Sequence, residues 1–156
     1  MNLLKNKNIL IVGVANKHSI AAGIAQSMSE NGANIALTYQ NERLKNNVEK
    51  IGQDLDITTF LPCDVSSDTE IEETFKSLAK EWDGLDGVIH AVGFAPREEL
   101  DGEFVDVTSR EGFQVAHEIS SYSFIGLAKE AKNMMKGRNG SLLTLSYLGS
   151  QMTLPN

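Results

Sequence analysis

The sequence predicts an α/β protein with a doubly wound parallel sheet. Short, nearly continuous apolar runs alternate with segments of helix length along the whole chain. Apolar runs without polar alternation are typical of parallel strands that are covered on both faces. Because repeated strand–helix–strand units connect through right-handed crossovers, we expect one domain over residues 1–156 with the strand order 3-2-1-4-5.

The first half of the chain contains three of the strands and two helices. They are predicted at residues 8–13, 19–31, 34–39, 42–50 and 58–63. The first strand is the unbroken apolar run NILIVG. In the helix that follows, Ile20, Ile24 and Met28 recur four residues apart, and Gly32 ends it.

The second half begins with a helix that Ser67 and Glu70 open as a capping box. The fourth strand is predicted at residues 86–92, a long helix at about 110–135, and the fifth strand at 141–147. Apolar residues of the long helix recur on one side, which predicts a buried stripe along its length. They are Phe113, Ala116, His117, Phe124, Leu127 and Ala131.

The loop after the first strand has features of a diphosphate site. Gly13 would let the backbone approach a ligand, and the next helix directs free N–H groups and a positive dipole end toward it. The usual G-x-G-x-x-G spacing is absent. Ser19 at the helix start either donates to a phosphate or serves as a plain N-cap, and the loop alone does not separate these two roles.

Residues with ligand chemistry also follow the next three strands. Gln40 ends the second strand, where its amide can bond the adenosine end of a dinucleotide, although Arg43 nearby leaves room for a 2′-phosphate. Asp64 can accept from an adenine amino group or help to start a helix. Gly93 either lies against a ribose or is a turn glycine. Since ligands of such sheets bind beyond the strand ends, we interpret these positions as one dinucleotide site.

Composition limits the classes of function. The net charge is −7, and residues 51–156 carry eight Lys/Arg against eighteen Asp/Glu, which argues against nucleic-acid binding. No signal peptide or membrane-length apolar run is evident, so we expect no membrane association and a cytoplasmic protein. Cys63 reads as an inert buried thiol. No metal site is expected, because the histidines lack ligand neighbours.

Six motifs then resemble one family in order along the chain. GVANKHSIAAGIAQ, TYQNERLK, CDVS, HAVGFAP, ISSYSF and LLTLSYLG are similar to the bacterial enoyl-[acyl carrier protein] reductases, a divergent Rossmann-like branch of the short-chain dehydrogenase/reductase superfamily. The resemblance implies reduction of trans-2-enoyl thioesters on acyl carrier protein in type II fatty acid elongation. It also implies NADH in preference to NADPH and a homotetramer when the protein is complete.

The resemblance also implies the roles of particular residues. Ala95 would touch the substrate, and Tyr147 would be the first of the family's two active-site tyrosines, beside the acyl chain and the reacting carbonyl. The implied cofactor contacts are Gly13, Ser19, Ile20, Gln40, Asp64, Val65, Val92 and Gly93.

One departure from the family pattern concerns the end of the sequence. In the family, SYLG…LPN continues into the second tyrosine and then, seven residues on, a lysine; here Asn156 is the last residue. The helix that carries those two residues and the last two strands are missing. We therefore expect this chain to be a segment of a longer polypeptide and to be neither stable nor active alone. The rival functions are another short-chain dehydrogenase such as a ketoacyl reductase, or a non-catalytic NAD(H)-binding module.

Overall fold

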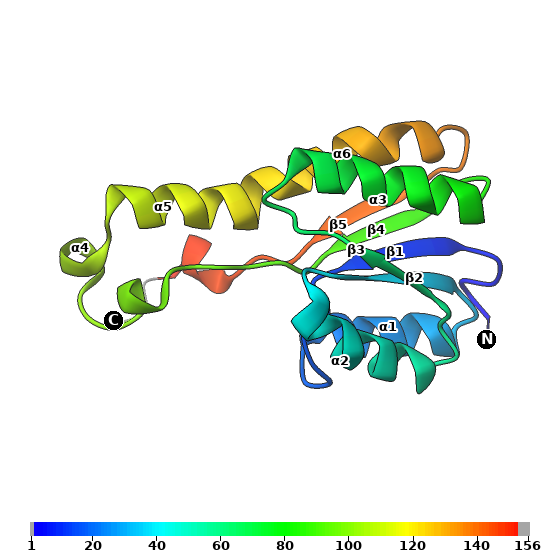
Figure 1. Cartoon of the computed structure of the whole chain (residues 1–156), viewed down its shortest axis with the longest axis horizontal. Helices are drawn as coiled ribbons and strands as arrows, with labels where there is room; N and C mark the ends of the chain where they lie inside the picture. Colours follow the sequence, from blue (N-terminus) through cyan, green and yellow to red (C-terminus); the bar gives the residue numbers. More distant parts are fainter. Residues whose placement is uncertain (1, 153–156) are drawn as a thin grey trace.

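The computed structural model describes residues 2–152 and has three layers, a parallel sheet between two pairs of helices (Figure 1). The strand order is β3-β2-β1-β4-β5, which confirms the predicted topology. The strands are β1 (Asn8–Val12), β2 (Asn34–Tyr39), β3 (Thr59–Pro62), β4 (Gly87–His90) and β5 (Ser141–Thr144). The long helices that cover them are α1 (Ile20–Glu30), α2 (Glu42–Gln53), α3 (Asp68–Glu81) and α6 (Ser123–Met134).

Alternate residues of β1 supply two separate cores. Ile9 and Ile11 pack in a cluster with α1 and with Val48 of α2, on one face of the sheet. Leu10 and Val12 pack in a second cluster with α3 and α6, on the other face. A strand buried on both faces needs apolar residues at every position, which is why NILIV carries no polar alternation.

Four of the strands end before the predicted boundaries. Pairing stops at Val12, Pro62 and His90, whereas the apolar runs continue for one or two residues. β5 stops at Thr144, three residues before its predicted end. The first residues beyond three of these strands still donate one backbone hydrogen bond to the neighbouring strand, from Cys63 to Tyr39, from Ala91 to Val12 and from Leu145 to His90. The positions predicted to bind a ligand lie among the residues that follow the strand ends. The apolar pattern therefore predicted where each strand lies, whereas the backbone hydrogen bonds determined the residue at which its ladder ends.

The long helix predicted over residues 110–135 is not continuous. The structure has α5 (Arg110–His117), a π-helical segment (η2, Glu118–Tyr122) and then α6. The predicted buried stripe is wrong for α5, because this helix extends past the sheet and has no surface to pack on. Phe113 of α5 is 51% exposed. Its ring lies beside the ring of His117 one turn further along the helix, with 4.1 Å between the two ring centroids.

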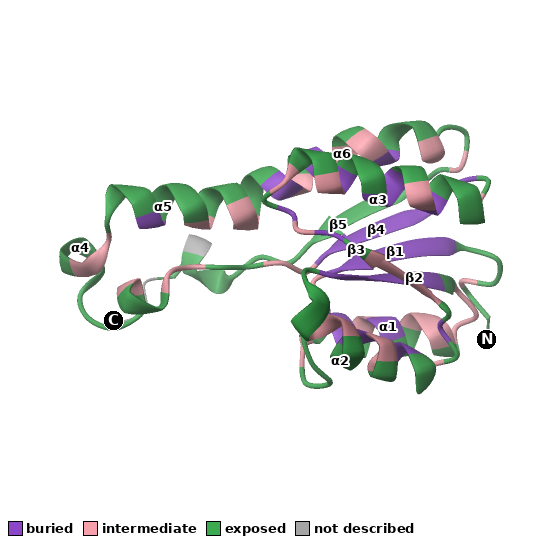
Figure 2. Cartoon of the chain, in the orientation of Figure 1, coloured by how far each residue is buried: buried purple, intermediate pink, exposed green. Residues whose placement is uncertain are grey.

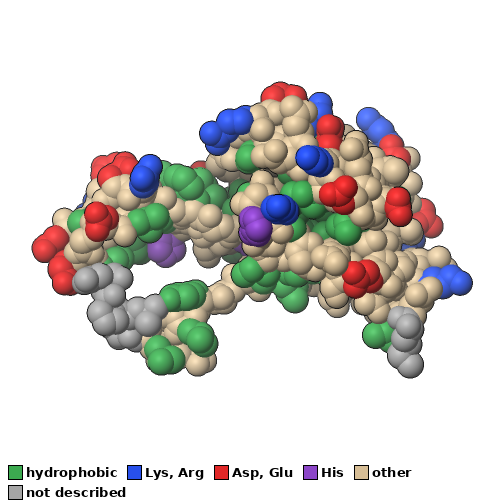
Figure 3. Space-filling view, turned by 90° about the horizontal axis from the view of Figure 1, so that it is seen from below, with side chains coloured by type: hydrophobic (Ala, Val, Ile, Leu, Met, Phe, Trp, Pro, Cys, Tyr) green, Lys and Arg blue, Asp and Glu red, His purple; other side chains and the backbone are tan. Residues whose placement is uncertain are grey.

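Residues 97–117 form an arm that projects from the carboxyl side of the sheet (Figures 1 and 2). It consists of a 3-10 turn (η1, Arg97–Glu99), α4 (Phe104–Val107) and α5. Figure 3 shows acidic side chains gathered at its tip and hydrophobic ones facing the hollow beside the body. The arm is held together by Glu99, which accepts from the backbone N–H of Ser109 at the start of α5 at 3.1 Å.

β5 lies at the edge of the sheet and is exposed along its length. Leu142 is 41% exposed, although its backbone pairs with Val88 of β4. The short 3-10 turn Leu148–Ser150 (η3) follows it. Within residues 2–152 the structure contains no helix with the length and apolar character that a membrane span requires.

Candidate dinucleotide-binding site

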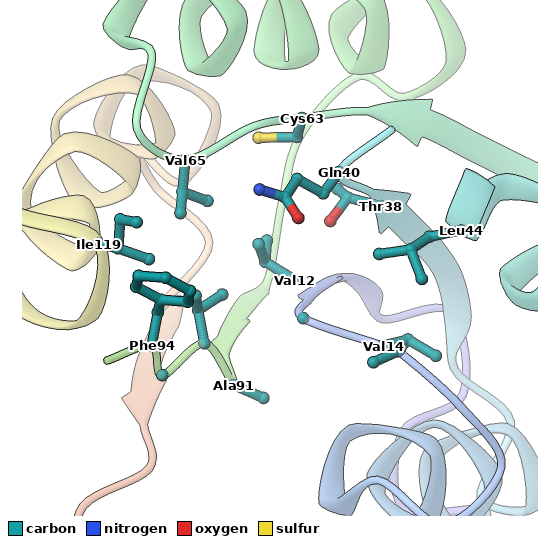
Figure 4. A pocket seen from close by; sticks show the side chains of 14 residues that line it. Val12, Val14, Thr38, Gln40, Leu44, Cys63, Val65, Ala91, Phe94 and Ile119 are labelled. Atoms are coloured by element: carbon teal, nitrogen blue, oxygen red, sulfur yellow. The ribbon is translucent and has the colours of Figure 1, made fainter. Parts of the chain in front are cut away.

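A pocket of about 320 Å³ opens at the carboxyl ends of β1 to β4. In Figure 4 the amide of Gln40 lies between Cys63 and Thr38, whereas Ile119, Val65 and Phe94 gather on another side. The complete lining is Val12, Gly13, Val14, Ala15, Thr38, Gln40, Leu44, Cys63, Val65, Ala91, Val92, Gly93, Phe94 and Ile119. Five of the predicted site residues are thus brought together here: Gly13, Gln40, Val65, Val92 and Gly93.

Gly13 forms the floor where β1 ends. Its φ of +105° is rarely adopted by residues with side chains, and a Cβ there would overlap the carbonyl of Ala91. The loop after β1 and the loop after β4 therefore approach each other closely. The fold by itself requires glycine at this position, whether or not a ligand binds.

Ser19 is the N-cap of α1, which is one of the two roles predicted for it. Its Oγ accepts from the N–H of Ala22 at 3.2 Å and donates to the carbonyl of Asn16 at 2.8 Å. Neither Ser19 nor Ile20 is among the residues that line the pocket. A contact of these two residues with phosphate stays a prediction.

Gln40 and Asp64 meet at the adenosine end that the sequence predicted. The Gln40 amide donates to the Asp64 carboxylate at 3.1 Å, and Ser66 donates to the same carboxylate through its N–H at 3.0 Å and its hydroxyl at 2.7 Å. Partial burial by itself would raise the pKa of Asp64, but the donors from Ser66 and Gln40 outweigh it and lower the pKa. A charged carboxylate therefore stands beside the pocket at neutral pH, although Asp64 is not among the lining residues.

The predicted capping box of α3 is only half formed. Ser67 Oγ accepts from the N–H of Glu70 at 3.2 Å, as predicted. The Glu70 carboxylate, however, accepts from the N–H of Asp64 at 2.8 Å instead of closing on Ser67. The chain between Asp64 and Ser67 forms a turn, so the N–H of Asp64 lies within reach of Glu70. Glu70 thereby fixes the backbone immediately after β3, beside the pocket.

Gly93 differs from Gly13 in its surroundings. A Cβ added to Gly93 would have no atom within 4 Å, and its φ lies outside the left-handed range. Nothing in the described fold therefore requires glycine at this position. Open space at a glycine that lines a pocket is the arrangement expected where a ligand approaches the backbone.

The two residues predicted to lie beside the substrate are also outside the pocket. Ala95 and Tyr147 do not line it, and the Tyr147 side chain is 66% exposed at the end of β5. Tyr147 lies three residues beyond Thr144, which pairs with His90 on the neighbouring strand. Their predicted roles toward substrate stay predictions, and residues 153–156, which include Leu154 to Asn156 of the LPN motif, lie outside the described part of the chain.

Sequence reasoning missed most of the apolar wall. Ile119 belongs to the π-helical segment, Leu44 to α2, and Phe94 to the loop after β4, and all three line the pocket. Phe94 stands in the HAVGFAP motif, next to a residue that was predicted. The irregular turn of helix that presents Ile119 has no sequence signal of its own, so a regular helical projection could not place it.

Cys63 is buried, as predicted, and burial raises the pKa of its thiol. It also lines the pocket, a position that the sequence did not indicate. Of the histidines, His18 and His117 are exposed and His90 is buried. Among residues 2–152, no three His, Cys, Asp or Glu side chains are grouped closely enough to hold a metal ion.

The sequence and the fold both match known proteins. The family model described as Enoyl-(Acyl carrier protein) reductase matches residues 13–156. Over all 156 residues the chain is 49% identical to the enoyl-[acyl-carrier-protein] reductase [NADH] FabI of Neisseria meningitidis serogroup B and 48% identical to that of Escherichia coli K12. It covers 60% and 59% of those two relatives, so it spans about three fifths of their length.

Solved structures agree with this match. The enoyl-[acyl-carrier-protein] reductase (NADH) of Aquifex aeolicus superposes with a TM-score of 0.95 at 44% identity, over 98% of this chain and 60% of that one. The reductase of Anaplasma phagocytophilum, solved in complex with NAD, gives 0.93 at 43% identity, over 98% and 58%. With the pocket in the same kind of fold and the family model matched from Gly13 onward, the chain belongs to the enoyl-(acyl carrier protein) reductase family.

Proposed function

We propose that this chain supplies the dinucleotide site of an NADH-dependent reductase of trans-2-enoyl-[acyl carrier protein]. The observation that carries the proposal is the pocket at the carboxyl ends of β1 to β4, which is polar at Gln40, whose amide is bonded to Asp64 beside the pocket, and apolar at Ile119 and Phe94. A dinucleotide has a polar adenosine end and a flat nicotinamide end, and this polarity fits the two ends of the pocket.

The proposed cofactor contacts are those predicted from the sequence. Gly13 supplies a close backbone approach for the diphosphate, between the adenosine end at Gln40 and Asp64 and the nicotinamide end at Val92 and Gly93. Val65 adds an apolar contact. Ser19 and Ile20 stand at the start of α1, whose N-terminal dipole favours an anion.

When bound, NADH supplies the hydride that adds to the β-carbon of the enoyl thioester. The residues of this chain then hold the reacting groups. In the proposal, Ala95 touches the acyl part, and Tyr147 directs its hydroxyl to the thioester oxygen, where negative charge develops. The complete reaction, its carrier-protein partner, a homotetrameric assembly and a cytoplasmic location are parts of the same proposal.

The preference for NADH over NADPH rests on Asp64. Its carboxylate accepts from Gln40 at 3.1 Å, and its lowered pKa keeps it charged at neutral pH. A 2′-phosphate at this end would face that negative charge. Lys45, a nearby cation that could offset it, is paired with Glu42 at 3.6 Å and lies over the ring of Tyr39.

Gly93→Ala tests the proposal, because the fold leaves space for the new methyl group. We expect an unchanged urea midpoint and an NADH dissociation constant raised about tenfold, measured by nucleotide fluorescence on the longest polypeptide that the gene encodes around these residues. Gly23→Ala is the matched control: it also meets no atom within 4 Å, but it lies in α1 away from the pocket lining. A wild-type chain that does not bind NADH contradicts the proposal.

Turnover is measured separately, on the longest polypeptide that the gene encodes around these residues. Oxidation of NADH is followed by its absorbance with a crotonyl thioester and, in parallel, with an acetoacetyl thioester. We expect turnover of the crotonyl thioester. Turnover of the acetoacetyl thioester alone would assign a ketoacyl reductase, and NADH binding without any turnover would assign a non-catalytic module.

A further inference from the structure

His90 is the only histidine among residues 2–152 that is buried, with 1% of its surface exposed. It ends β4, directly before the pocket residue Ala91. Its Nδ1 lies 2.8 Å from the Thr144 hydroxyl, and its Nε2 lies 2.8 Å from the Ser123 hydroxyl. Both ring nitrogens therefore have a partner, one on β5 and one at the start of α6.

The bonds around Ser123 determine where the proton on the ring lies. The Ser123 hydroxyl donates to the carbonyl of Ile119 at 2.6 Å. A serine hydroxyl has only one proton to donate, so Ser123 must accept from Nε2–H of the ring. Nδ1 is then the acceptor for the Thr144 hydroxyl. Burial lowers the pKa of His90 and favours this neutral form.

The resulting chain of hydrogen bonds runs in one direction through three elements. It begins at the Thr144 hydroxyl on β5, passes through the imidazole of β4 and ends at the carbonyl of Ile119 in the π-helical segment. The Ile119 side chain lines the pocket, so the last bond fixes the backbone of a pocket residue.

A second contact joins the same segment to the loop after β4. The Ser120 hydroxyl accepts from the N–H of Phe94 at 2.9 Å and donates to its carbonyl at 3.1 Å. Phe94 also lines the pocket. The segment that carries Ile119 is therefore bonded to the loop after β4 through Ser120 and to β4 itself through His90. Only the His90 contact extends to β5.

We propose that His90 is a positioning residue for the nicotinamide half of the bound cofactor. Through its two hydrogen bonds, His90 fixes the position of the segment that carries Ile119 and of Thr144, the last residue of β5, relative to β4. His90 itself does not line the pocket. The inference rests on the proposed NADH site. It goes further in separating the two halves of that site, because the network does not reach Gln40 or Asp64.

Ser123→Ala tests the inference by leaving Nε2–H without its acceptor. We expect the dissociation constant for NADH to rise about tenfold, whereas that for ADP, which carries only the adenosine and diphosphate, changes less than about twofold. Both are measured by calorimetry on the longest polypeptide that the gene encodes around these residues. Ser29→Ala is the control: it removes a hydroxyl that bonds the carbonyl of Leu55 at 3.1 Å, outside the pocket lining.

Two Thr144 variants test the other end of the network. Thr144→Val keeps the shape of the side chain and loses the hydroxyl, whereas Thr144→Ser keeps the hydroxyl. We expect weaker NADH binding for Thr144→Val alone. Equal losses for NADH and ADP in Ser123→Ala and Thr144→Val would indicate a merely structural role and overturn the proposal, as would unchanged NADH binding in both variants.

A measurement on the wild-type chain does not depend on the folding of any variant. Long-range ¹⁵N–¹H correlation spectra should show His90 as the neutral Nε2–H tautomer, with its nitrogen shifts moving on addition of NADH and not of ADP. An Nδ1–H or doubly protonated ring at neutral pH would overturn the proposal. Wild-type chain that binds neither nucleotide would instead contradict the dinucleotide site itself, and the His90 proposal with it.

Discussion

Two glycines of the pocket differ in whether the fold requires a residue without a side chain. Gly13 has a φ of +105° and its missing Cβ leaves room for the carbonyl of Ala91, whereas Gly93 has open space and an ordinary φ. The first is therefore demanded by the fold, whereas nothing in the described fold demands the second. Substitutions separate the two cases because they act on different measurements.

Gly13→Ala should destabilise the chain. Adding a Cβ at this φ and against a backbone oxygen that cannot move away is expected to cost about 1–3 kcal/mol of the free energy of unfolding. Gly23→Ala, in the middle of α1 with free space around it, should instead stabilise by about 0.5–1 kcal/mol. Urea unfolding followed by circular dichroism measures both. Equal midpoints for the two variants would show that the close approach of the two loops is not rigid.

Asp64 carries the negative charge at the proposed adenosine end of the site. Asp64→Asn removes the negative charge that would face a 2′-phosphate and retains the shape of the side chain. We expect the ratio of NADH to NADPH affinity to fall about fivefold, measured by competitive titration. Taking the ratio cancels any loss of adenine binding that is common to both cofactors. Asp106→Asn makes the same charge change on α4 and should leave the ratio as it is.

At the scale of elements, the π-helical segment separates two regions with different burial. α6 packs on α3 and buries Ser123, Gly126, Leu127 and Ala131. In the arm, the only buried residue of the three helices is Gly112. π-helical turns are frequent at functional sites, and this one directs Ile119 to the pocket at the boundary between the body and the arm.

The arm should open without unfolding of the sheet. With so little buried surface, amides of residues 104–117 are expected to exchange with solvent about 100-fold faster than those of α3, which buries four residues. Hydrogen exchange followed by mass spectrometry on peptides from each region gives the comparison. If the arm were as protected as α3, it would have to pack on a surface other than those in this structure.

At the scale of the whole molecule, one carboxylate joins the residues at the start of β1 to the loop between α6 and β5. Asp86 accepts from Lys7 at 3.0 Å, from the N–H of Asn8 at 3.0 Å and from Arg138 at 3.2 Å, and its side chain is only 7% exposed. Burial on its own would raise the pKa of Asp86, but these donors and cations lower it. The contact closes the amino end of the sheet, opposite the pocket.

Stability should therefore fall with acid through this group. A depressed pKa in the folded state means that the contribution is complete above the ordinary pKa of aspartate. As the pH falls below that value the unfolded chain takes up the proton first, so the contribution is lost by the time the folded carboxyl is protonated. Asp86→Asn should cost about 1–3 kcal/mol at pH 7, and progressively less as the pH falls below the ordinary pKa of aspartate. Chemical denaturation across this pH range measures the difference.

Asp83→Asn is the matched control for Asp86. It removes the other carboxylate that binds Arg138, but its side chain is 86% exposed, where an ion pair contributes little. We expect a change below about 0.5 kcal/mol at any pH. A pH-independent loss in Asp86→Asn would mean that the contact acts through its hydrogen bonds and not through its charge.

The sequence by itself determined the topology and the location of the site. Unbroken apolar runs that alternate with helices specify a doubly wound parallel sheet, and the order 3-2-1-4-5 that we expected for it is the one observed. Since the carboxyl ends of parallel strands meet at one edge, Gly13, Gln40, Val92 and Gly93 could be expected to gather there, and they line one pocket. These inferences need only local pattern and chain direction.

Only the tertiary structure decided the break at residues 118–122, the exposure of α5 and the contact that each ring nitrogen of His90 makes. A helical projection assumes a regular period of about 3.6 residues and assumes that each turn of the helix packs on a neighbouring element. Both assumptions fail here, because the period changes at the π-helical segment and α5 extends beyond the sheet. The sequence likewise does not distinguish a glycine needed by the backbone from one that leaves space. That distinction depends on atoms that are remote in the chain, such as the carbonyl of Ala91 beside Gly13.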